Sequence, residues 1–274
     1  MIPNTLTIAG VDPSGGAGVL ADIKTMSALG AYGTAVIAAL TAQNTRAVTG
    51  IQPVPAAFVA EQIDTLFSDV RIDAVKIGML GQKAVTRVVA ERLAHWKPTH
   101  LVLDPVMVAK SGDHLLERAA VDELRESLIP LCTLITPNLP EAGVLLGATP
   151  ADTLKDMRRM AEKLRRLLSD NGERWVYLKG GHLPGNDTID VLHDGDRLIE
   201  LPGRRIETRN THGTGCTLSA ALAALLPRTN DVPEAARQAK AYLVQAIARA
   251  SDLDVGSGHG PVQHFHHWWP AAGA

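Results

Sequence analysis

The stretch LTIAGVDPSGGAGVLADIKTMSAL, residues 6–29, contains the first unit of the predicted fold. Its apolar run at 6–9 predicts a strand that ends at Gly10, and a helix is expected from about residue 17 to residue 29. The Asp-Pro-Ser-Gly-Gly sequence at 12–16 predicts a tight turn between them. Such a turn places backbone groups at the carboxyl edge of a sheet, where open α/β proteins bind ligands. The stretch therefore predicts an α/β fold, and its turn is either part of a ligand site or a plain connection.

Similar apolar runs, rich in β-branched residues, recur between longer amphipathic stretches along the chain. They lie at residues 35–42, 74–77, 101–103, 131–136 and 175–178. Strands that are apolar on both sides and alternate with helices, such as the surface helix expected at 153–168, indicate a parallel sheet covered on both faces. Two short runs around Asp-Gly at 194–195 predict a hairpin. We therefore expect a three-layer α/β/α fold with a mainly parallel central sheet and an antiparallel edge.

The composition restricts the class of protein. With 27 basic and 29 acidic residues in 274, the formal net charge of -2 gives no positive field for a nucleic acid or an anionic membrane. No apolar run reaches the roughly 20 residues of a membrane span. Two cysteines without paired spacing, and a start without a secretory signal pattern, favour a cytoplasmic location. Because no linker or repeat marks a boundary, residues 1–274 are expected to form one domain.

A second glycine segment, NTHGTGCT at residues 210–217, leads directly into small and apolar residues at 218–226. These residues predict a buried helix that starts in a glycine loop. Unpaired amides at a helix start form an anion site with the helix dipole behind them, and such a site stabilises the charge that develops in phosphoryl transfer. The same field predicts a lowered thiol pKa for Cys216, and a buried structural cysteine is the alternative. Cys132, within an apolar run, is expected in a core strand.

Two common nucleotide-binding motifs do not fit these glycine segments. The chain has no G-x-x-x-x-G-K-[ST] sequence, and residues 10–18 do not match G-x-G-x-x-G. A P-loop is therefore excluded, and a dinucleotide-binding fold is disfavoured.

Six stretches, in their order and spacing, carry a resemblance to a known family. They are TIAGVDPSGGAG (7–18), KIGML (76–80), LDPVM (103–107), TPNLPE (136–141), KGGH (179–182) and THGTGC (211–216). Together they resemble the hydroxymethylpyrimidine/phosphomethylpyrimidine kinases of thiamine biosynthesis, from about residue 6 to residue 269. The resemblance implies a ribokinase-like fold, ATP with Mg²⁺, and phosphorylation of 4-amino-5-hydroxymethyl-2-methylpyrimidine to its monophosphate and then its diphosphate. It also suggests a homodimer.

The resemblance implies which residues contact the pyrimidine. Gly10 and Asp12 in the first glycine turn, with Gln43, are the implied substrate contacts, and Met79 and Val106 are the apolar walls. The amide of Gln43 offers both a donor and an acceptor to an aminopyrimidine edge. Some family members have glutamate at this position, so the hydrogen-bond pattern can differ. A polar residue at a strand end is the alternative for Gln43.

The resemblance also implies residues near the phosphates and the metal. Asn138 and Glu141 match the family's N-x-x-E motif, with Glu141 as a metal partner, but Asn-x-x-Glu is equally the pattern of a helix capping box. Lys179 resembles the family's phosphate-facing lysine, and a solvated lysine before a turn is the alternative. Asp104 ends an apolar strand, where an unpaired carboxylate is costly to bury, so we expect it at the metal or phosphate site.

The glycine loop supplies the remaining implied roles. The implied catalytic residues are Lys179, Gly213, Thr214, Gly215 and Cys216, and the implied nucleotide contacts are Asn138, Lys179, Thr211, Gly213 and Gly215. In the wider ribokinase-like group the residue after Gly-Thr-Gly is commonly aspartate, taken as the base for the substrate hydroxyl, whereas cysteine, as at position 216, is typical of the pyrimidine kinases. Because phosphoryl transfer depends on positioning and charge more than on a strong base, a thiolate can suffice.

Two other functions stay open. A pyridoxal or pyridoxine kinase acts on a similar nitrogen heterocycle with a CH₂OH group, and only Cys216 and the surroundings of Gln43 argue against it. A non-catalytic pyrimidine-binding sensor would keep the pocket but would not need the transfer residues.

The sequence near the end of the chain, GPVQHFHHWW at residues 260–269, has the residue types of a metal site. Alternating histidines and aromatics at a terminus more often pack onto the body of a protein. We therefore expect packing here and no metal.

Overall fold

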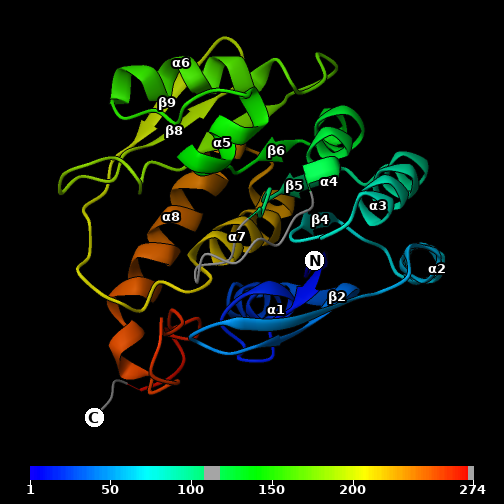
Figure 1. Ribbon diagram of the computed structural model, residues 1–274, viewed down its shortest axis with the longest axis horizontal. Helices are drawn as coiled ribbons and strands as arrows, with labels where there is room; N and C mark the ends of the chain where they lie inside the picture. Colours follow the sequence, from blue (N-terminus) through cyan, green and yellow to red (C-terminus); the bar gives the residue numbers. More distant parts are fainter. Residues whose placement is uncertain (108–117, 271–274) are drawn as a thin grey trace.

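The computed structural model describes residues 1–107 and 118–270, and their strands form a nine-stranded sheet in the order β3-β2-β1-β4-β5-β6-β7-β8-β9 (Figure 1). The strands are β1 (Asn4–Val11), β2 (Tyr32–Gln43), β3 (Val48–Pro53), β4 (Ala74–Ile77), β5 (His100–Leu103), β6 (Leu134–Ile135), β7 (Trp175–Leu178), β8 (Asp190–His193) and β9 (Leu198–Leu201). Six neighbouring strands, in the order β2-β1-β4-β5-β6-β7, pair in parallel. The predicted hairpin is confirmed, because β8 and β9 form an antiparallel edge next to β7. The antiparallel pairing of β3 with β2 at the opposite edge was not predicted.

Helices cover both faces of this sheet, so the predicted three-layer architecture is confirmed (Figure 1). The helices are α1 (Gly18–Ala28), α2 (Ala56–Phe67), α3 (Lys83–Trp96), α4 (Arg118–Glu123), α5 (Leu139–Leu146), α6 (Leu154–Arg165), α7 (Thr214–Thr229) and α8 (Val232–Ala248). One apolar core lies between the sheet and α2, α3, α5 and α6. The core on the opposite face is built with α1, α7 and α8. Short turns of other helix types lie at Leu124–Leu128, Ile129–Leu131 and Ala250–Asp252.

Helix α7 is central to the second core. Its residues from Thr217 to Leu226 are all buried, as the small and apolar sequence predicts. It packs between α1 and α8, and also against β4 and β5. Each fully buried leucine stabilises the fold by about 1.5–3 kcal/mol, so the position of this helix is strongly determined.

The predicted core strand at 131–136 is wrong in its first half. The chain forms a 3-10 turn at Ile129–Leu131, and the strand is only Leu134–Ile135. Pro130 has no amide hydrogen for a ladder, and the tight turn brings the Cys132 thiol to the Leu128 carbonyl oxygen at 3.3 Å. Cys132 is nevertheless fully buried, so its expected place in the core is confirmed although it lies outside the strand.

The histidine-rich segment at 260–269 packs onto the body of the protein. His264 is buried, its Nε2 lies 3.2 Å from the Thr217 hydroxyl on α7, and its carbonyl accepts a 2.7 Å hydrogen bond from Tyr242 on α8. Across residues 1–107 and 118–270, no group of three or more His, Cys, Asp or Glu side chains could hold a metal ion.

None of the helices in the described part of the chain is both long enough and apolar enough to cross a bilayer.

Candidate active site

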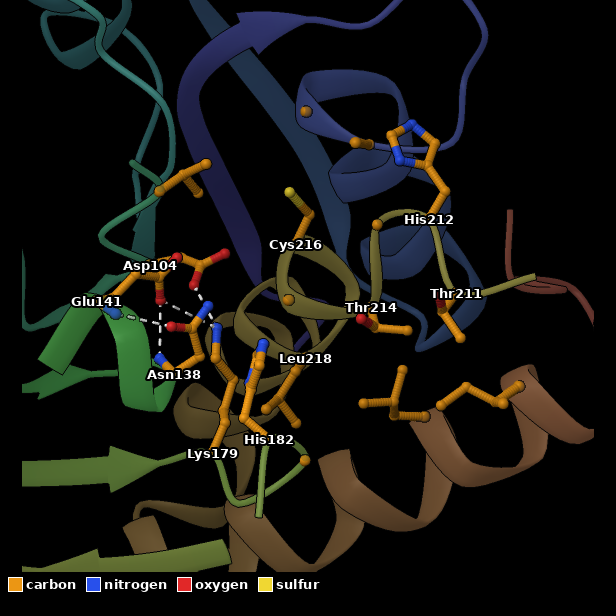
Figure 2. Close-up of a pocket in the computed structure, with 18 of the residues that line it drawn as sticks. Asp104, Asn138, Glu141, Lys179, His182, Thr211, His212, Thr214, Cys216 and Leu218 are labelled. Carbon is orange, nitrogen blue, oxygen red and sulfur yellow. Dashed lines mark hydrogen bonds and ion pairs between the residues drawn. The ribbon is translucent and has the colours of Figure 1, made fainter. Parts of the chain in front are cut away.

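A cavity of about 760 Å³ opens at the carboxyl edge of the parallel strands (Figure 2). It brings together the first glycine turn, the end of β2, the start of α5, the loop after β7 and the start of α7. The predicted site residues that line it are Gly10, Asp12, Gln43, Met79, Asp104, Val106, Asn138, Glu141, Lys179, Thr211, Gly213, Thr214, Gly215 and Cys216. Residues spread over most of the chain thus share one space, and their individual roles remain predictions.

The start of α7 faces this cavity. Gly213 is its N-cap residue and has a left-handed backbone, with φ of 76° and ψ of 12°. A Cβ atom at Gly213 would lie 1.7 Å from the Gly16 carbonyl oxygen, so only glycine fits against the first glycine turn. A Cβ at Gly215 would lie 3.2 Å from the Lys179 Nζ and 3.3 Å from an Asp104 carboxylate oxygen. The missing side chain at Gly215 therefore leaves room for an anion beside the first-turn amides and Lys179.

Asp12 ties the two glycine loops together. Its carboxylate accepts hydrogen bonds from the Ser14 amide at 2.9 Å, the Ser14 hydroxyl at 2.7 Å and the Ala17 amide at 3.0 Å. The His212 Nε2 lies 2.6 Å from the Asp12 Oδ2, the same oxygen that accepts from the Ala17 amide. Burial alone would raise the pKa of Asp12, but the hydrogen bonds from His212 and Ser14 outweigh it and lower the pKa. Asp12 is thus occupied in holding its own turn and the loop that carries Gly213.

Lys179 forms the centre of a charged cluster in the cavity (Figure 2). Its Nζ lies 2.9 Å from the Asp104 Oδ1 and 3.8 Å from the Glu141 Oε2, and Thr136 donates to the same Asp104 oxygen at 3.2 Å. Burial would lower the pKa of Lys179, but the two carboxylates outweigh burial and raise it. Its side chain is only 16% exposed, so the alternative of a solvated lysine is wrong.

Asn138 and Glu141 form the capping box of α5. The Asn138 side chain accepts from the Glu141 amide at 2.8 Å, and the Glu141 carboxylate accepts from the Asn138 amide at 2.8 Å. The same Glu141 oxygen faces Lys179, so the carboxylate caps the helix and also belongs to the charged cluster. Burial, only partly offset by Lys179, raises the pKa of Glu141 to about 7.

The predicted lowering of the Cys216 pKa is wrong. The residue is partly exposed at the cavity wall, but protein surrounds its thiol, and this burial is the main cause that raises the pKa to about 11. The charge of Lys76 acts in the opposite direction, while Asp22 and Asp104 raise the pKa further. Position at a helix start is therefore not sufficient to make the thiol acidic.

The predicted pyrimidine contacts also line the cavity. The Gly10 amide donates to the Met79 carbonyl at 3.1 Å, and a Cβ on Gly10 would lie 2.7 Å from the Met79 Cε. Only a residue without a side chain therefore leaves the Met79 thioether in its place. The Gln43 side-chain oxygen accepts from the Thr41 hydroxyl at 3.1 Å, which orients its amide at the cavity edge.

Sequence reasoning missed several cavity residues. They include Thr41, His182, Thr188, Asp190, Arg204, Arg205, Ile206, His212, Leu218, Lys240, Leu243, Val244 and Ile247. Most come from the loop after β7, the segment after β9 and one face of α8. The pair Arg204-Arg205 beside a glycine was the available signal for an anion-binding segment. The apolar residues of α8 carry no such signal in the sequence, because their pattern is that of ordinary core positions.

Comparison with known proteins agrees with this geometry. The family model described as phosphomethylpyrimidine kinase matches residues 12–263. The hydroxymethylpyrimidine/phosphomethylpyrimidine kinase of Escherichia coli strain K12 is 52% identical over 268 residues, which is 97% of this chain and 98% of that protein.

Two solved structures resemble the whole fold. A phosphomethylpyrimidine kinase from Clostridium difficile has a TM-score of 0.78 at 39% identity, covering 89% of this chain and 99% of that one. An ADP complex of Bacillus subtilis pyridoxal kinase has a TM-score of 0.87 at 34% identity, covering 96% of this chain and 98% of that one. The match of the family model to nearly the full length, together with the identity to the E. coli enzyme, shows that this chain belongs to the phosphomethylpyrimidine kinase family.

Proposed function

We propose that this protein is an ATP-dependent kinase that phosphorylates 4-amino-5-hydroxymethyl-2-methylpyrimidine and then phosphorylates the monophosphate to the diphosphate. One observation carries the proposal: the glycine loop at the start of α7 opens into the same cavity as Gly10 and Gln43. A phosphate at the loop and a hydroxymethyl group near Gly10 would therefore meet in one space. The name of the E. coli relative, with its 52% identity over nearly the full length of both proteins, supports both phosphorylation steps.

The residues of the cavity suit phosphoryl transfer. The transferred group carries charge on three oxygens, so catalysis depends mainly on positioning and on electrostatic stabilisation. The amides near Gly213 and Gly215, with the helix dipole of α7, would bind these oxygens. Lys179 adds a full positive charge at the same place, and its raised pKa keeps it protonated at neutral pH.

The carboxylates of the cluster are compatible with Mg²⁺ only if phosphates complete its ligands. Asp104 and Glu141 offer oxygen atoms, but both already contact Lys179, and the described residues provide no third acidic, cysteine or histidine ligand. Mg²⁺ commonly uses one or two carboxylates together with waters and substrate phosphates, which matches this donor set. When bound, it would neutralise charge on the nucleotide phosphates. Asp104 and Glu141 are our candidates to hold it.

The proposal is tested by incubating the purified protein with ATP, Mg²⁺ and the pyrimidine alcohol, and identifying the products by mass. We expect the monophosphate first and the diphosphate later. Consumption of no ATP, despite binding of the pyrimidine, would replace this proposal by a pyrimidine-binding sensor.

Pyridoxal kinase activity is the second candidate, because the B. subtilis pyridoxal kinase matches the fold with a TM-score of 0.87. Both acceptors are six-membered nitrogen heterocycles with a CH₂OH group, so the cavity size does not separate them. The ratio of kcat/KM for the pyrimidine alcohol to that for pyridoxal decides between the two functions. We expect this ratio to exceed one.

A homodimer in the cytoplasm completes the proposal. Leu40 on β2 and Ile51 on β3 are apolar and exposed on the two faces of this sheet edge, so we expect self-association through the edge itself. Gel filtration with light scattering tests it. Both cysteines are free thiols, which agrees with a reducing compartment.

A further inference from the structure

The end of β2 that carries Gln43 extends beyond its neighbour β1. The backbone pairing of these two strands ends at Leu40 opposite Val11. Beyond that point, the Thr41 hydroxyl still donates to the Val11 carbonyl at 2.9 Å, and among the described strands residues 41–43 pair with β3 alone. Strand β3 is an edge strand whose residues are mostly exposed. The sheet therefore gives this proposed pyrimidine contact little support of its own.

The tip of the β2–β3 hairpin is held instead by residues 255–261, which we call the strap segment and which are drawn in red in Figure 1. The Gly258 amide donates to the Thr45 hydroxyl oxygen at 3.1 Å, and the His259 amide donates to the Thr45 carbonyl oxygen at 2.9 Å. Both the side chain and the backbone of Thr45 are thus fixed by a segment more than 200 positions away in the sequence.

The turn that contains Thr45 is closed by its own hydrogen bonds. The Asn44 side-chain oxygen accepts from the Arg46 amide at 2.8 Å and from the Ala47 amide at 3.1 Å, and the Asn44 amide donates to the Ala47 carbonyl at 3.1 Å. Gln43 directly precedes this closed turn. The position of Thr45 on the strap segment therefore also determines the position of Gln43.

The other end of the strap segment holds the glycine loop. The His212 amide donates to the Gly260 carbonyl at 3.0 Å, and His212 forms a parallel bridge with Pro261. Gly260 and Pro261 are both buried. The residue after His212 is Gly213, the N-cap of α7. One short segment thus contacts the loop next to Gln43 and the loop that begins α7.

Glycines allow the close contact at both ends of the strap segment. A Cβ at Gly258 would lie 2.1 Å from the Thr45 carbonyl oxygen, and a Cβ at Gly260 would lie 2.4 Å from the Asn210 Oδ1. Both distances are far below van der Waals contact, so a side chain at either position would push the strap segment and its loop apart.

The strap segment lies outside the candidate active site. Neither Thr45 nor any of residues 255–261, all of which the structure describes, lines the cavity. A substitution at these positions therefore removes no group that faces a bound reactant. It can change the reaction only by moving Gln43 or the start of α7.

We propose that Thr45 is a positioning residue, which acts through the strap segment to fix the pyrimidine wall at Gln43 relative to the phosphate loop at the start of α7. This inference rests on the proposed kinase function, in which the hydroxymethyl group and the transferred phosphate meet between these two walls. A misplacement of about 1 Å can lower the rate of such a transfer about 10²-fold. When the contact is weakened, each wall still binds its own reactant, but the two reactants are no longer aligned.

The first experiment separates kcat from KM in a steady-state assay with ATP and the pyrimidine alcohol. Thr45→Val removes the hydroxyl that accepts from Gly258, and Gly258→Ala pushes the Thr45 carbonyl away. We expect kcat to fall about tenfold in Thr45→Val and about 10²-fold in Gly258→Ala, while KM for each substrate stays within about twofold. A normal kcat in folded Thr45→Val, or a change in KM alone, overturns the proposal.

Two threonine variants are the controls for this assay. Thr45→Ser keeps the hydroxyl, so it should keep kcat within about twofold of the original value. Thr49→Val removes a hydroxyl in the same hairpin, one that donates to the Ala42 carbonyl at 3.1 Å and not to the strap segment, and it should also keep kcat. Loss of kcat in Thr49→Val equal to that in Thr45→Val would show a general effect on the hairpin and overturn the proposal.

The second experiment measures the coupling without catalysis, by hydrogen exchange and mass spectrometry. In Thr45→Val we expect exchange about threefold or more faster at residues 43–47 and also at residues 209–213, where the His212 amide is bonded to the strap segment. Faster exchange at 43–47 alone overturns the proposal. If the original protein phosphorylates neither alcohol, the proposed function fails, and the exchange at 209–213 still decides whether Thr45 acts on the glycine loop.

Discussion

Replacement of Gly213 by alanine tests whether the start of α7 is the anion site. The left-handed backbone at Gly213 costs a residue with a side chain about 1–2 kcal/mol. The new Cβ would also lie 1.7 Å from the Gly16 carbonyl oxygen, and a backbone shift to relieve such an overlap costs about 1–3 kcal/mol more. We therefore expect Gly213→Ala to lower the free energy of unfolding by about 2–5 kcal/mol.

Gly172→Ala is the matched control. Gly172 has φ of 79°, almost the same as Gly213, but an added Cβ would meet nothing within 4 Å. Urea denaturation should thus show the backbone cost of about 1–2 kcal/mol in the control, and the overlap cost in addition at Gly213. The backbone shift in Gly213→Ala moves the amides of the first turn of α7. We therefore expect kcat to fall about 10²-fold or more in this variant and to stay unchanged in Gly172→Ala. Equal stability of the two variants would refute the overlap argument, and normal turnover by a folded Gly213→Ala protein would refute the anion site.

Three further changes address the remaining site residues. Lys179→Met should lower kcat about 10²-fold or more in a steady-state assay, because it removes the positive charge at the phosphate site, whereas Lys155→Met on the exposed face of α6 should not. The Glu141 pKa of about 7 lies above its ordinary 4.5, so the folded state holds this proton more tightly, and stability contributed by it is lost as pH rises from about 4.5 to 7. Glu141→Gln should therefore flatten the pH dependence of urea denaturation over this range, and an unchanged slope would contradict the raised pKa. Cys216→Ala should lower kcat about 10²-fold, while Cys132→Ala should reduce only stability; near-full turnover of Cys216→Ala would exclude its role as the base.

Local sequence patterns were sufficient for much of the fold. The period of α6 and the Asp-Gly turn between β8 and β9 are set by neighbouring residues, so both elements were predicted with the correct type. Strand β3 was missed because most of its residues are exposed, and its pairing with β2 is what makes it a strand. The segment around Cys132 shows the reverse case, in which the start of an apolar run is part of a turn because Pro130 directly precedes it.

Only part of the cavity lining was predictable from the sequence, and the electrostatics of the site were less predictable still. The glycine loop and the residues around Lys179 were identified, because each follows a strand or begins a helix at one edge of the sheet. The contact between Asp12 and His212 joins residues 200 positions apart, and the one between Lys76 and Asp22 joins residues 54 apart. Contacts between residues so far apart in the sequence cannot be read from local patterns. The pKa of Cys216 was mispredicted for this reason, because burial and two aspartates distant in the sequence outweigh the local effect of the helix start.

Helix α7 both borders the cavity and packs in the core, so a substitution that changes one role also changes the other. Its first turn borders the cavity, and its buried alanines, including Ala220 and Ala224, contact α1. A larger residue at either alanine would tilt the whole helix and redirect the amides of its first turn. Substitutions in α7 that raise thermal stability would therefore lower the turnover rate. Helix α6, on the opposite side of the sheet and away from the cavity lining, can be redesigned without that trade-off.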